Sequence, residues 1–298
     1  MDNVTKEARV KLFDKRYQIL SILGRGSQSV VYKAIDVGKK NKEVALKVLV
    51  RKKDKKLTEQ LRKEALILVS CKHKNIIQLY DFHALNELCY LSLEYAPYGD
   101  LNQYLHKVKK LTAEQAVLFL IQTAEALQAM HDAGIYHRDV KPDNILVANP
   151  SLIKLGDLGV ASLPGEEFLL EELRKGVGTL SYMPPEVLVG KGFTQRSDLY
   201  ALGVTFWEVL AGTHPFEGVP LLKQLSVRED KNLVPLSKKN PEVPQYLSDA
   251  ILKLMRFKPQ DRFSSAEELI KFLKKKGASK QSKTVSKEEV NKEEKKKS

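Results

Sequence analysis

Two short segments near the middle of the chain concentrate side chains that handle phosphate groups and divalent cations. One is His137-Arg138-Asp139-Val140-Lys141-Pro142-Asp143-Asn144, and the other, Asp157-Leu158-Gly159, follows it closely. Carboxylate and amide oxygens are the hard ligands that Mg²⁺ prefers. A carboxylate can also accept the proton of a hydroxyl group, and a lysine can neutralise phosphate charge. The two segments therefore predict phosphate and Mg²⁺ chemistry.

A glycine-containing segment, Gly24-Arg25-Gly26-Ser27-Gln28-Ser29, lies between two expected strands near the N-terminus. Glycine would let backbone amides approach a phosphate where a Cβ would obstruct them. An ordinary hairpin turn explains the same glycines equally well. Because the segment does not open a helix, a dinucleotide-binding fold is disfavoured.

One lysine, Lys47, ends the apolar segment Val44-Ala45-Leu46-Lys47. It is either an edge residue whose ammonium group reaches solvent or a cation held for an anion. Glu64, on the amphipathic helix expected next, could form a buried ion pair with it, which would keep the ammonium group charged and directed at phosphate oxygens. These two residues alone support an ion pair no better than chance would.

The elements that must position these residues change character along the chain. The first third is rich in expected strands and the remainder in expected helices, one of which begins with the capping box Thr112-Ala113-Glu114-Gln115. We expect two lobes, about residues 15–94 and 97–275, joined by a hinge at residues 94–97. The expected strands lie within Tyr17 to Asp36, Val44 to Val50 and Ile76 to Tyr95, and the expected helices are Leu57 to Ser70, Leu111 to His131, Asp198 to Ala211 and one that starts at Ser265.

The composition is that of a globular protein in a reducing compartment. Of 298 residues, 43% are hydrophobic and 29% are charged, and Cys71 and Cys89 cannot form a disulfide framework. No apolar run is long enough to span a bilayer, and the N-terminal residues lack the apolar region of a signal peptide. The histidines show no metal-ligand spacing, and His131 is expected to cap its helix.

The net charge of +13 is local. Its excess lies in residues 39–56 and 274–298, and the rest of the chain is balanced. Residues 276–298 alternate Lys with Glu and are expected to form a solvated, disordered tail or linker. The alternative is a contact of this tail with nucleic acid or an acidic membrane surface, although no aromatic residues interleave the lysines.

In combination, these motifs resemble those of the eukaryotic-type (Hanks-type) protein kinase family. Gly178-Thr179-Leu180-Ser181-Tyr182-Met183-Pro184-Pro185-Glu186 is similar to the family's substrate-docking loop and its closing Ala-Pro-Glu, with Pro184 in place of Ala. Asp198 is similar to the helix aspartate that braces the catalytic loop, and Arg262 to the late arginine that pairs with Glu186. The resemblance implies a kinase domain over residues 1–275 with an α+β, bilobal fold: a small antiparallel-sheet N-lobe with one main helix, and a larger, mostly helical C-lobe.

The resemblance also implies phosphoryl transfer from ATP, which depends on positioning and charge neutralisation more than on covalent chemistry. It implies that Asp139 accepts or orients the proton of the substrate hydroxyl, that Lys141 neutralises γ-phosphate charge, and that Asn144 and Asp157 bind Mg²⁺. Lys47, oriented by Glu64, would contact the α- and β-phosphates. The other implied ATP-binding residues are Leu23, Gly24 and Gly26 at the glycine segment, Val31, Ala45 and Leu146 around adenine, Leu93 as the gatekeeper, Glu94 and Ala96 in the hinge, and Asp100 at the ribose.

The class of acceptor hydroxyl follows from the same resemblance. Lys141, two residues after Asp139, and Thr179 in the docking loop are typical of Ser/Thr kinases. We therefore expect ATP- and Mg²⁺-dependent phosphorylation of Ser/Thr in protein substrates, with autophosphorylation. A scaffold module of kinase fold is the main alternative, but such modules usually lack the lysine or one of the aspartates. A small-molecule kinase is a further alternative, against which the docking loop argues.

The stretch between Asp157 and Glu186 departs from the usual pattern. Arg138 precedes Asp139, which in the family usually implies an activating phosphate, yet no Ser, Thr or Tyr lies between Ser162 and Thr179. Two interpretations stay open: glutamates replace the phosphate and pair with Arg138 or nearby lysines, or the loop is simply acidic and solvated. The glutamates concerned are Glu166, Glu167, Glu171 and Glu172.

The segment Ser197-Asp198-Leu199-Tyr200-Ala201-Leu202-Gly203-Val204 is more similar to bacterial members of the family than to animal ones. Many such bacterial kinases carry a lysine-rich juxtamembrane linker after the kinase domain. The expected location is therefore the cytoplasm, either as a free protein or as the cytosolic portion of a membrane-anchored kinase. The family further implies a regulatory homodimer formed through the N-lobe.

Overall fold

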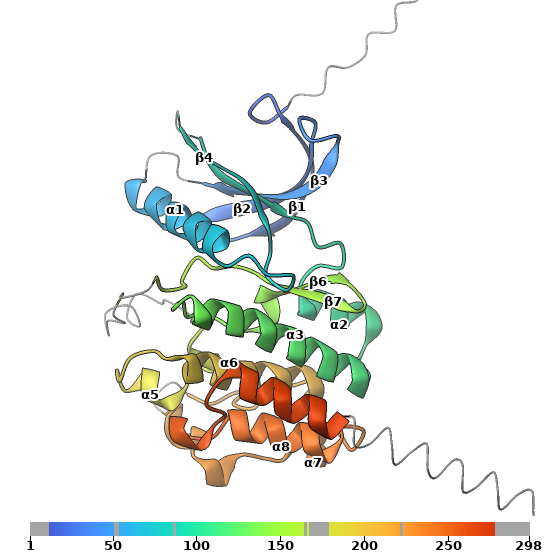
Figure 1. Ribbon diagram of the computed structural model, residues 1–298, viewed down its shortest axis with the longest axis vertical. Coiled ribbons are helices and arrows are strands. Elements are labelled where there is room, and N and C mark those ends of the chain that lie inside the picture. Colours follow the sequence, from blue (N-terminus) through green and yellow to red (C-terminus); the bar gives the residue numbers. More distant parts are fainter. Residues whose placement is uncertain are drawn as a thin grey trace, which may run out of the picture. The chain divides into compact units, whose positions relative to one another are not determined.

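The computed structural model describes residues 12–50, 54–85, 88–163, 166, 179–220 and 223–277 (Figure 1). The predicted tail, apart from Lys276 and Gly277, lies outside these residues. The chain divides into two compact units. The first unit comprises the residues up to Lys72 together with Ile77–Pro97, and the second comprises His73–Ile76 together with the chain from Tyr98 onward.

The first unit is a five-stranded antiparallel sheet with one helix. β2 and β3 are rich in β-branched and aliphatic residues, which favour strands, and the buried side chains Val30, Ala34, Val44 and Leu46 lie on one face of the sheet. The buried side chains of one sheet face form a small core of Tyr17, Ala34, Val44, Leu46 and Tyr90. The strands follow the order β1-β2-β3-β5-β4, with bounds β1 Tyr17–Arg25, β2 Ser29–Asp36, β3 Lys42–Leu49, β4 Leu79–Leu85 and β5 Leu88–Glu94.

The helix of this unit, α1 (Lys55–Ser70), begins after Asp54, whose side chain accepts hydrogen bonds from the N–H groups of Lys56 and Leu57. This N-cap satisfies two of the backbone donors that a helix start leaves free. The apolar stripe of α1 is buried, and Glu64 is buried within it. A carboxylate on this face needs a cationic or hydrogen-bonding partner.

The second unit is mostly helical, as expected. Helix α3 (Ala113–Asp132) starts with the predicted capping box, in which Thr112 and Gln115 bond reciprocally. Helix α6 (Gln195–Ala211) is apolar all round and almost entirely buried, and Gly212 ends it in the left-handed conformation. The other elements are α2 Leu101–Val108, β6 Ile145–Asn149, β7 Leu152–Leu155, α5 Pro185–Leu188, α7 Leu236–Lys239, α8 Gln245–Leu254, a helix over 266–277, and 3₁₀ turns Pro142–Asn144, Leu180–Tyr182, Ser226–Arg228, Asp230–Asn232 and Pro259–Asp261.

The short segment His73–Ile76 lies in the first lobe by sequence but belongs to the second unit. The buried Asn75 explains this: its side-chain amide donates to the carbonyl of Ile153, and its own carbonyl accepts from the N–H of Leu155. Hydrogen bonds to β7 therefore fix this segment on the second unit.

No helix among the described residues is long and apolar enough to cross a membrane.

Candidate active site

The buried carboxylate of Asp198, in the first turn of α6, fixes the backbone that leads to Asp139. Its Oδ1 accepts a hydrogen bond from the N–H of Arg138, and its Oδ2 accepts one from the N–H of His137, both at 2.9 Å. The Nε2 atom of His131 lies 2.8 Å from the same Oδ2, so His131 contacts α6 rather than only capping its own helix. Hydrogen bonds to a charged, fully buried group are strong because the surroundings screen them little.

Asp139 itself lies in a network with three other polar residues. Its Oδ1 accepts hydrogen bonds from the N–H of Thr179 at 2.9 Å and from the Thr179 hydroxyl at 2.8 Å. Its Oδ2 lies 2.8 Å from Nζ of Lys141 and accepts from Nδ2 of Asn144 at 2.9 Å. Nζ of Lys141 also donates to the Thr179 hydroxyl at 2.8 Å. An alcohol oxygen is thus bound between a carboxylate and an ammonium group.

Asn144 and Asp157, the residues expected to bind Mg²⁺, lie on segments that bond to each other. The carbonyl of Asn144 accepts from the N–H of Gly156 at 2.9 Å. The side-chain nitrogen of Asn144 donates twice to Asp139, whereas its Oδ1 accepts no hydrogen bond from the described residues. Asp157 is exposed. The donor set available here, an amide oxygen and a carboxylate, fits a hard divalent cation.

Two residues of this region adopt the left-handed backbone conformation that side chains rarely take. The φ angle is 67° at Arg138 and 53° at Asp157. Such residues cost roughly 1–3 kcal/mol each and persist where the surroundings determine them. The contacts of Asp198 with the Arg138 N–H and of Asn144 with Gly156 supply that determination.

In the first unit, Lys47 and Glu64 form the expected ion pair. Nζ of Lys47 lies 2.9 Å and 2.8 Å from the two carboxylate oxygens of Glu64. The Glu64 side chain is 4% exposed and that of Lys47 is 16% exposed. The ammonium group is therefore fixed by a buried carboxylate.

The sheet register collects the other predicted ATP-binding residues of this unit on one face. Val31 pairs with Gly24 on β1 and with Lys47 on β3. Ala45, two residues before Lys47, pairs with Leu93 on β5. Because side chains two residues apart share a sheet face, Val31, Ala45, Lys47 and Leu93 lie together, opposite the face that carries Ala34, Val44 and Leu46.

Gly24 and Gly26 adopt backbone conformations that are open to other residues. Neither Gly24 nor Gly26 has a positive φ. A Cβ added at Gly24 would meet nothing within 4 Å, and one at Gly26 would meet only the Ser29 carbonyl oxygen at 3.6 Å. The segment forms the turn that joins β1 and β2, in which the N–H of Gly26 donates to the Ser29 carbonyl. Because neither glycine needs a conformation closed to other residues, the turn does not by itself require glycine at these positions, and both interpretations stay open. Leu23, beside them, is 39% exposed.

Predicted ATP-binding residues also lie near the boundary between the units. Glu94 ends β5, where its N–H donates to the carbonyl of Gln78. Ala96 is buried, and its N–H donates to no described residue. In the second unit, Asp100 is the N-cap of α2 and accepts from the N–H of Gln103, and it forms a bridge with Leu146 on β6. Burial raises the pKa of the Asp100 carboxyl.

Comparison with known proteins agrees with this geometry. The protein kinase domain model matches residues 17–291. This chain belongs to the protein kinase family.

Individual kinases resemble this domain over most of its length. The serine/threonine-protein kinase PrkC of Bacillus subtilis is 32% identical over 87% of this chain and 40% of its own length. The human serine/threonine-protein kinase ULK1 is 34% identical over 83% of this chain and 24% of its own. An Aurora kinase of Schizosaccharomyces pombe is 35% identical over 83% of this chain and 68% of its own. The expected likeness to bacterial kinases is confirmed, and eukaryotic kinases match at similar identity.

The end of the kinase domain's docking loop is fixed by an ion pair. Glu186 on α5 and Arg262 bond through both carboxylate oxygens, at 2.7 Å and 2.8 Å. The Ser197 hydroxyl donates to the same carboxylate at 3.0 Å. Arg262 also donates to the carbonyls of Arg196 and Phe257. The pair predicted from sequence is therefore present, inside a network that links α5, α6 and the segment before Arg262.

The middle of the docking loop is fixed by Arg228, which sequence analysis did not identify. The side chain of Arg228 is fully buried, and it donates to the carbonyls of Leu180, Ser181 and Met183 at 3.0, 2.8 and 3.0 Å. It also lies over the Phe216 ring. No carboxylate pairs with it among the described residues, and burial lowers the pKa of its guanidinium group. Backbone carbonyls leave no signal in the sequence, so no motif could have found this residue.

A second cluster that the motifs did not reveal lies beside the docking loop. The Tyr182 hydroxyl donates to Glu208 at 2.5 Å, and the Tyr182 ring contacts His214 edge to face. Burial raises the pKa of Glu208 and lowers that of His214 to about 4. This cluster connects the loop to α6 at a place remote in sequence.

The acidic segment proposed to replace an activating phosphate lies almost wholly outside the described residues. Glu167, Glu171 and Glu172 fall there. Glu166 accepts a hydrogen bond from the N–H of Leu163 at 3.0 Å. Arg138 is 5% exposed, with its guanidinium carbon 6.0 Å from the Phe193 ring centroid. The replacement of phosphate by glutamate stays a prediction.

Proposed function

We propose that this domain is a protein serine/threonine kinase that transfers the γ-phosphoryl group of ATP to hydroxyl groups of protein substrates. The observation that carries the proposal is the Thr179 hydroxyl, which donates to Asp139 and accepts from Lys141. It shows that these two side chains can bind an alcohol with its proton directed at the carboxylate. Proton acceptance by a positioned carboxylate and neutralisation of the phosphoryl charge by an ammonium group are the needs of this reaction.

Each unit would supply a separate part of the ATP-binding machinery. In the first unit, Lys47 with Glu64 would neutralise the α- and β-phosphates, the amides near Gly24 and Gly26 would approach the phosphates, and the face carrying Val31 would contact adenine. In the second unit, Asn144 and Asp157 would bind Mg²⁺, which would supply charge neutralisation at the phosphates. Among the described residues, the Oδ1 atom of Asn144 accepts no hydrogen bond and the N–H of Ala96 donates none, which supports a ligand at both places. The remaining proposed contacts are those of Leu23, Ala45, Leu93, Glu94, Asp100 and Leu146.

The chain spans about 40% of the length of the bacterial relatives it matches. Protein substrates are expected of any protein kinase, but their identity is a property of the whole protein. We propose that the domain works within the cytosolic part of a longer kinase, with residues 276–298 as a linker. A salt-dependent binding assay on acidic vesicles and on nucleic acid, with and without residues 276–298, tests whether that linker has a contact of its own.

The first test compares the wild type with Asp157→Asn. Both proteins are incubated with Mg²⁺, γ-labelled ATP and a generic basic protein, and the labelled sites are mapped. Label in the wild type only, confined to Ser and Thr, is the expected result. Label on tyrosine would contradict the acceptor class. Absence of label in both proteins, with ATP binding intact, would favour a scaffold module.

A further inference from the structure

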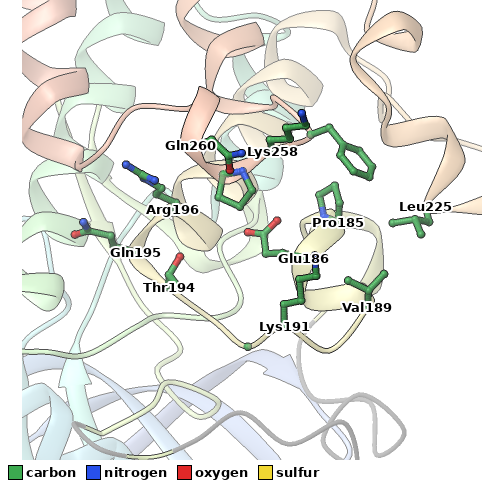
Figure 2. Close-up of a pocket in the computed structure, with 13 residues that line it drawn as sticks. Pro185, Glu186, Val189, Lys191, Thr194, Gln195, Arg196, Leu225, Lys258 and Gln260 are labelled. Carbon is green, nitrogen blue, oxygen red and sulfur yellow. The ribbon is translucent and has the colours of Figure 1, made fainter.

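A cavity of about 800 Å³ lies in the second unit, directly after the docking loop (Figure 2). It is formed by α5 and the segment after it, the first turn of α6, Leu225, and residues 257–260. None of the residues proposed for catalysis or ATP binding lines it. Its size falls within the range of pockets that bind a ligand of several residues or a drug-sized molecule. We call it the basic pocket.

The walls of the basic pocket combine apolar surface with positive charge. Val189 and Leu225, two of the large apolar side chains that the fold leaves exposed, are 48% and 37% exposed, and both line it. Lys191, Arg196 and Lys258 line it as well (Figure 2).

The positive charge of this lining has no paired carboxylate in the part of the chain that the structure describes. None of Lys191, Arg196 and Lys258 pairs with a carboxylate of the described residues. Glu186, the one acidic residue of the lining, already binds Arg262 through both of its oxygens. The pocket therefore presents three cations without a competing free carboxylate, and a partner of negative charge complements it.

The basic pocket is connected to the docking loop by short covalent and hydrogen-bonded links. Pro185 and Glu186 follow the loop directly, and Leu225 precedes the 3₁₀ turn Ser226–Arg228. Arg228, at the end of that turn, binds the loop carbonyls of Leu180, Ser181 and Met183. A peptide bound in the pocket would thus lie against the same elements that present the acceptor segment.

From these observations we infer that the basic pocket is a docking site for an acidic segment of a protein substrate, in which carboxylates flank a large apolar side chain. The apolar side chain lies between Val189 and Leu225, and the carboxylates pair with Lys191, Arg196 and Lys258. The identification of the partner as a substrate rests on the proposed kinase function. The binding itself requires neither ATP nor phosphoryl transfer.

The test is a binding measurement without nucleotide. The probe is a fluorescein-labelled, capped peptide Glu-Glu-Leu-Glu-Phe-Glu-Glu, titrated with the full chain and followed by fluorescence anisotropy. Two matched peptides accompany it: one with Gln at every Glu, and one with Ser in place of Leu and Phe. We expect saturable binding of the first peptide, weakened by added salt, and weaker binding of both matched peptides.

The variants locate the binding. The double variant Lys191→Gln, Lys258→Gln removes two exposed charges of the pocket, and we expect the Kd of the acidic peptide to rise roughly three- to tenfold. Lys107→Gln with Lys238→Gln removes the same charge from exposed lysines elsewhere on the unit and should leave the Kd within twofold. Leu225→Ser removes an apolar wall of the pocket. In this variant, the Kd of the acidic peptide and the Kd of the peptide with Ser in place of Leu and Phe should differ less than in the wild type. Circular dichroism checks that each variant is folded.

Several outcomes would overturn the inference. These are no saturable binding, equal losses in the pocket and control variants, or displacement of the peptide by millimolar inorganic phosphate, which would indicate a simple anion site. Displacement by a peptide of this chain's own sequence 166–173, with a dimer seen at the same concentrations, would assign the pocket to a second copy and also overturn it. Phosphorylation of the generic basic protein by the wild type, measured alongside, separates failure of the docking inference from failure of the proposed function.

Discussion

The residues proposed to act on the acceptor hydroxyl and those proposed to cover the phosphates are supported in opposite ways by their own units. In the second unit, a fully buried carboxylate, Asp198, binds the backbone immediately before Asp139. In the first unit, β1 is exposed from Ile19 to its end at Arg25, and a Cβ at Gly24 would meet nothing within 4 Å. One region is fixed by contacts within its own unit, whereas the other has open space around its backbone.

This difference corresponds to the two demands of phosphoryl transfer. The group that orients the attacking hydroxyl must be preorganised, because a displaced base loses much of its effect. The segment over the phosphates must instead admit and release a nucleotide, so it cannot be packed by its own chain. Lys47 is intermediate between the two regions, because the buried carboxylate of Glu64 fixes its ammonium group although 16% of its side chain is exposed.

Asp198→Ala should have the largest effect, because it removes the contacts that distinguish the preorganised region. The change leaves the buried N–H groups of His137 and Arg138 without an acceptor. We expect activity to fall at least about 100-fold and the free energy of unfolding to fall by about 3 kcal/mol. Urea denaturation and steady-state kinetics measure the two effects.

The matched control for this change is Asp249→Ala on α8, an exposed aspartate that, among the described residues, accepts a side-chain hydrogen bond from Gln245 alone. It should change the free energy of unfolding by no more than about 0.5 kcal/mol. If Asp198→Ala proved as mild as Asp249→Ala, the catalytic loop would not depend on α6, and the contrast between the two regions would fail.

Lys47→Met tests a residue that is intermediate between the fixed backbone before Asp139 and the exposed strand β1. We expect kcat/KM for ATP to fall about 100-fold, since a cation fixed for the phosphates is lost. The change also leaves Glu64 buried without this ammonium group, so the free energy of unfolding should fall by about 2 kcal/mol. Adding Glu64→Gln should restore most of the stability and none of the activity.

For the same measurement, Lys33→Met breaks a more exposed ion pair on the neighbouring strand, with Glu43. An exposed pair contributes about 0–1 kcal/mol, so this variant should remain close to the wild type in stability. A loss of stability in Lys33→Met equal to that in Lys47→Met would show that burial of Glu64 does not matter.

Arg228→Met tests whether the docking loop is preorganised like the catalytic loop. Three loop carbonyls lose their donor, and we expect KM for a protein substrate to rise about tenfold, or about 1.4 kcal/mol, with KM for ATP nearly unchanged. Arg228→Lys, which keeps one donor group, should recover part of the effect. An equal rise in both KM values would indicate general unfolding instead of loop displacement.

The sequence predicted best the features that side chains specify locally. The capping box at Thr112 and Gln115 placed the start of α3 correctly. Helix α6 starts at Gln195, three residues before the predicted start. Its capping box pairs Thr194 with Ser197. The box was missed because its third residue is usually Glu or Gln, and here it is serine. The hairpin β6–β7 was missed because its strands are short and enclosed by helical patterns.

Within the candidate site, motif residues were predictable and their supports were not. Lys47, Asp139 and Asn144 were identified from motifs that resemble those of the kinase family, and the Lys47–Glu64 and Glu186–Arg262 pairs are present. The roles proposed for these residues remain predictions. Arg228 was missed because its partners are backbone carbonyls, which every residue type provides. The basic pocket was missed because three stretches of chain that are distant in sequence form it.

Two glycines, one in the packed helix α6 and one in the exposed strand β1, allow the smallest change that compares the two regions. A Cβ at Gly203, inside α6, would lie 2.7 Å from Cβ of Leu254 and 2.9 Å from Cγ of Met255. Gly203→Ala should therefore destabilise the protein by about 1–2 kcal/mol, the cost of overpacking less the gain in helix propensity, with KM for ATP unchanged. Gly24→Ala has open space around its new methyl group and should leave stability within about 0.5 kcal/mol of the wild type.

If phosphates approach the backbone at Gly24, the same methyl group should raise KM for ATP by roughly threefold, a loss of less than 1 kcal/mol of binding. Thermal denaturation and ATP-dependent kinetics on both variants separate the two kinds of glycine. A Gly24→Ala protein with an unchanged KM would mean that the exposed segment does not contact the nucleotide. The exposure of β1 near Gly24 would then be unrelated to ATP binding. The explanation for the fixed backbone before Asp139 would still hold, because the contacts of Asp198 do not depend on the first unit.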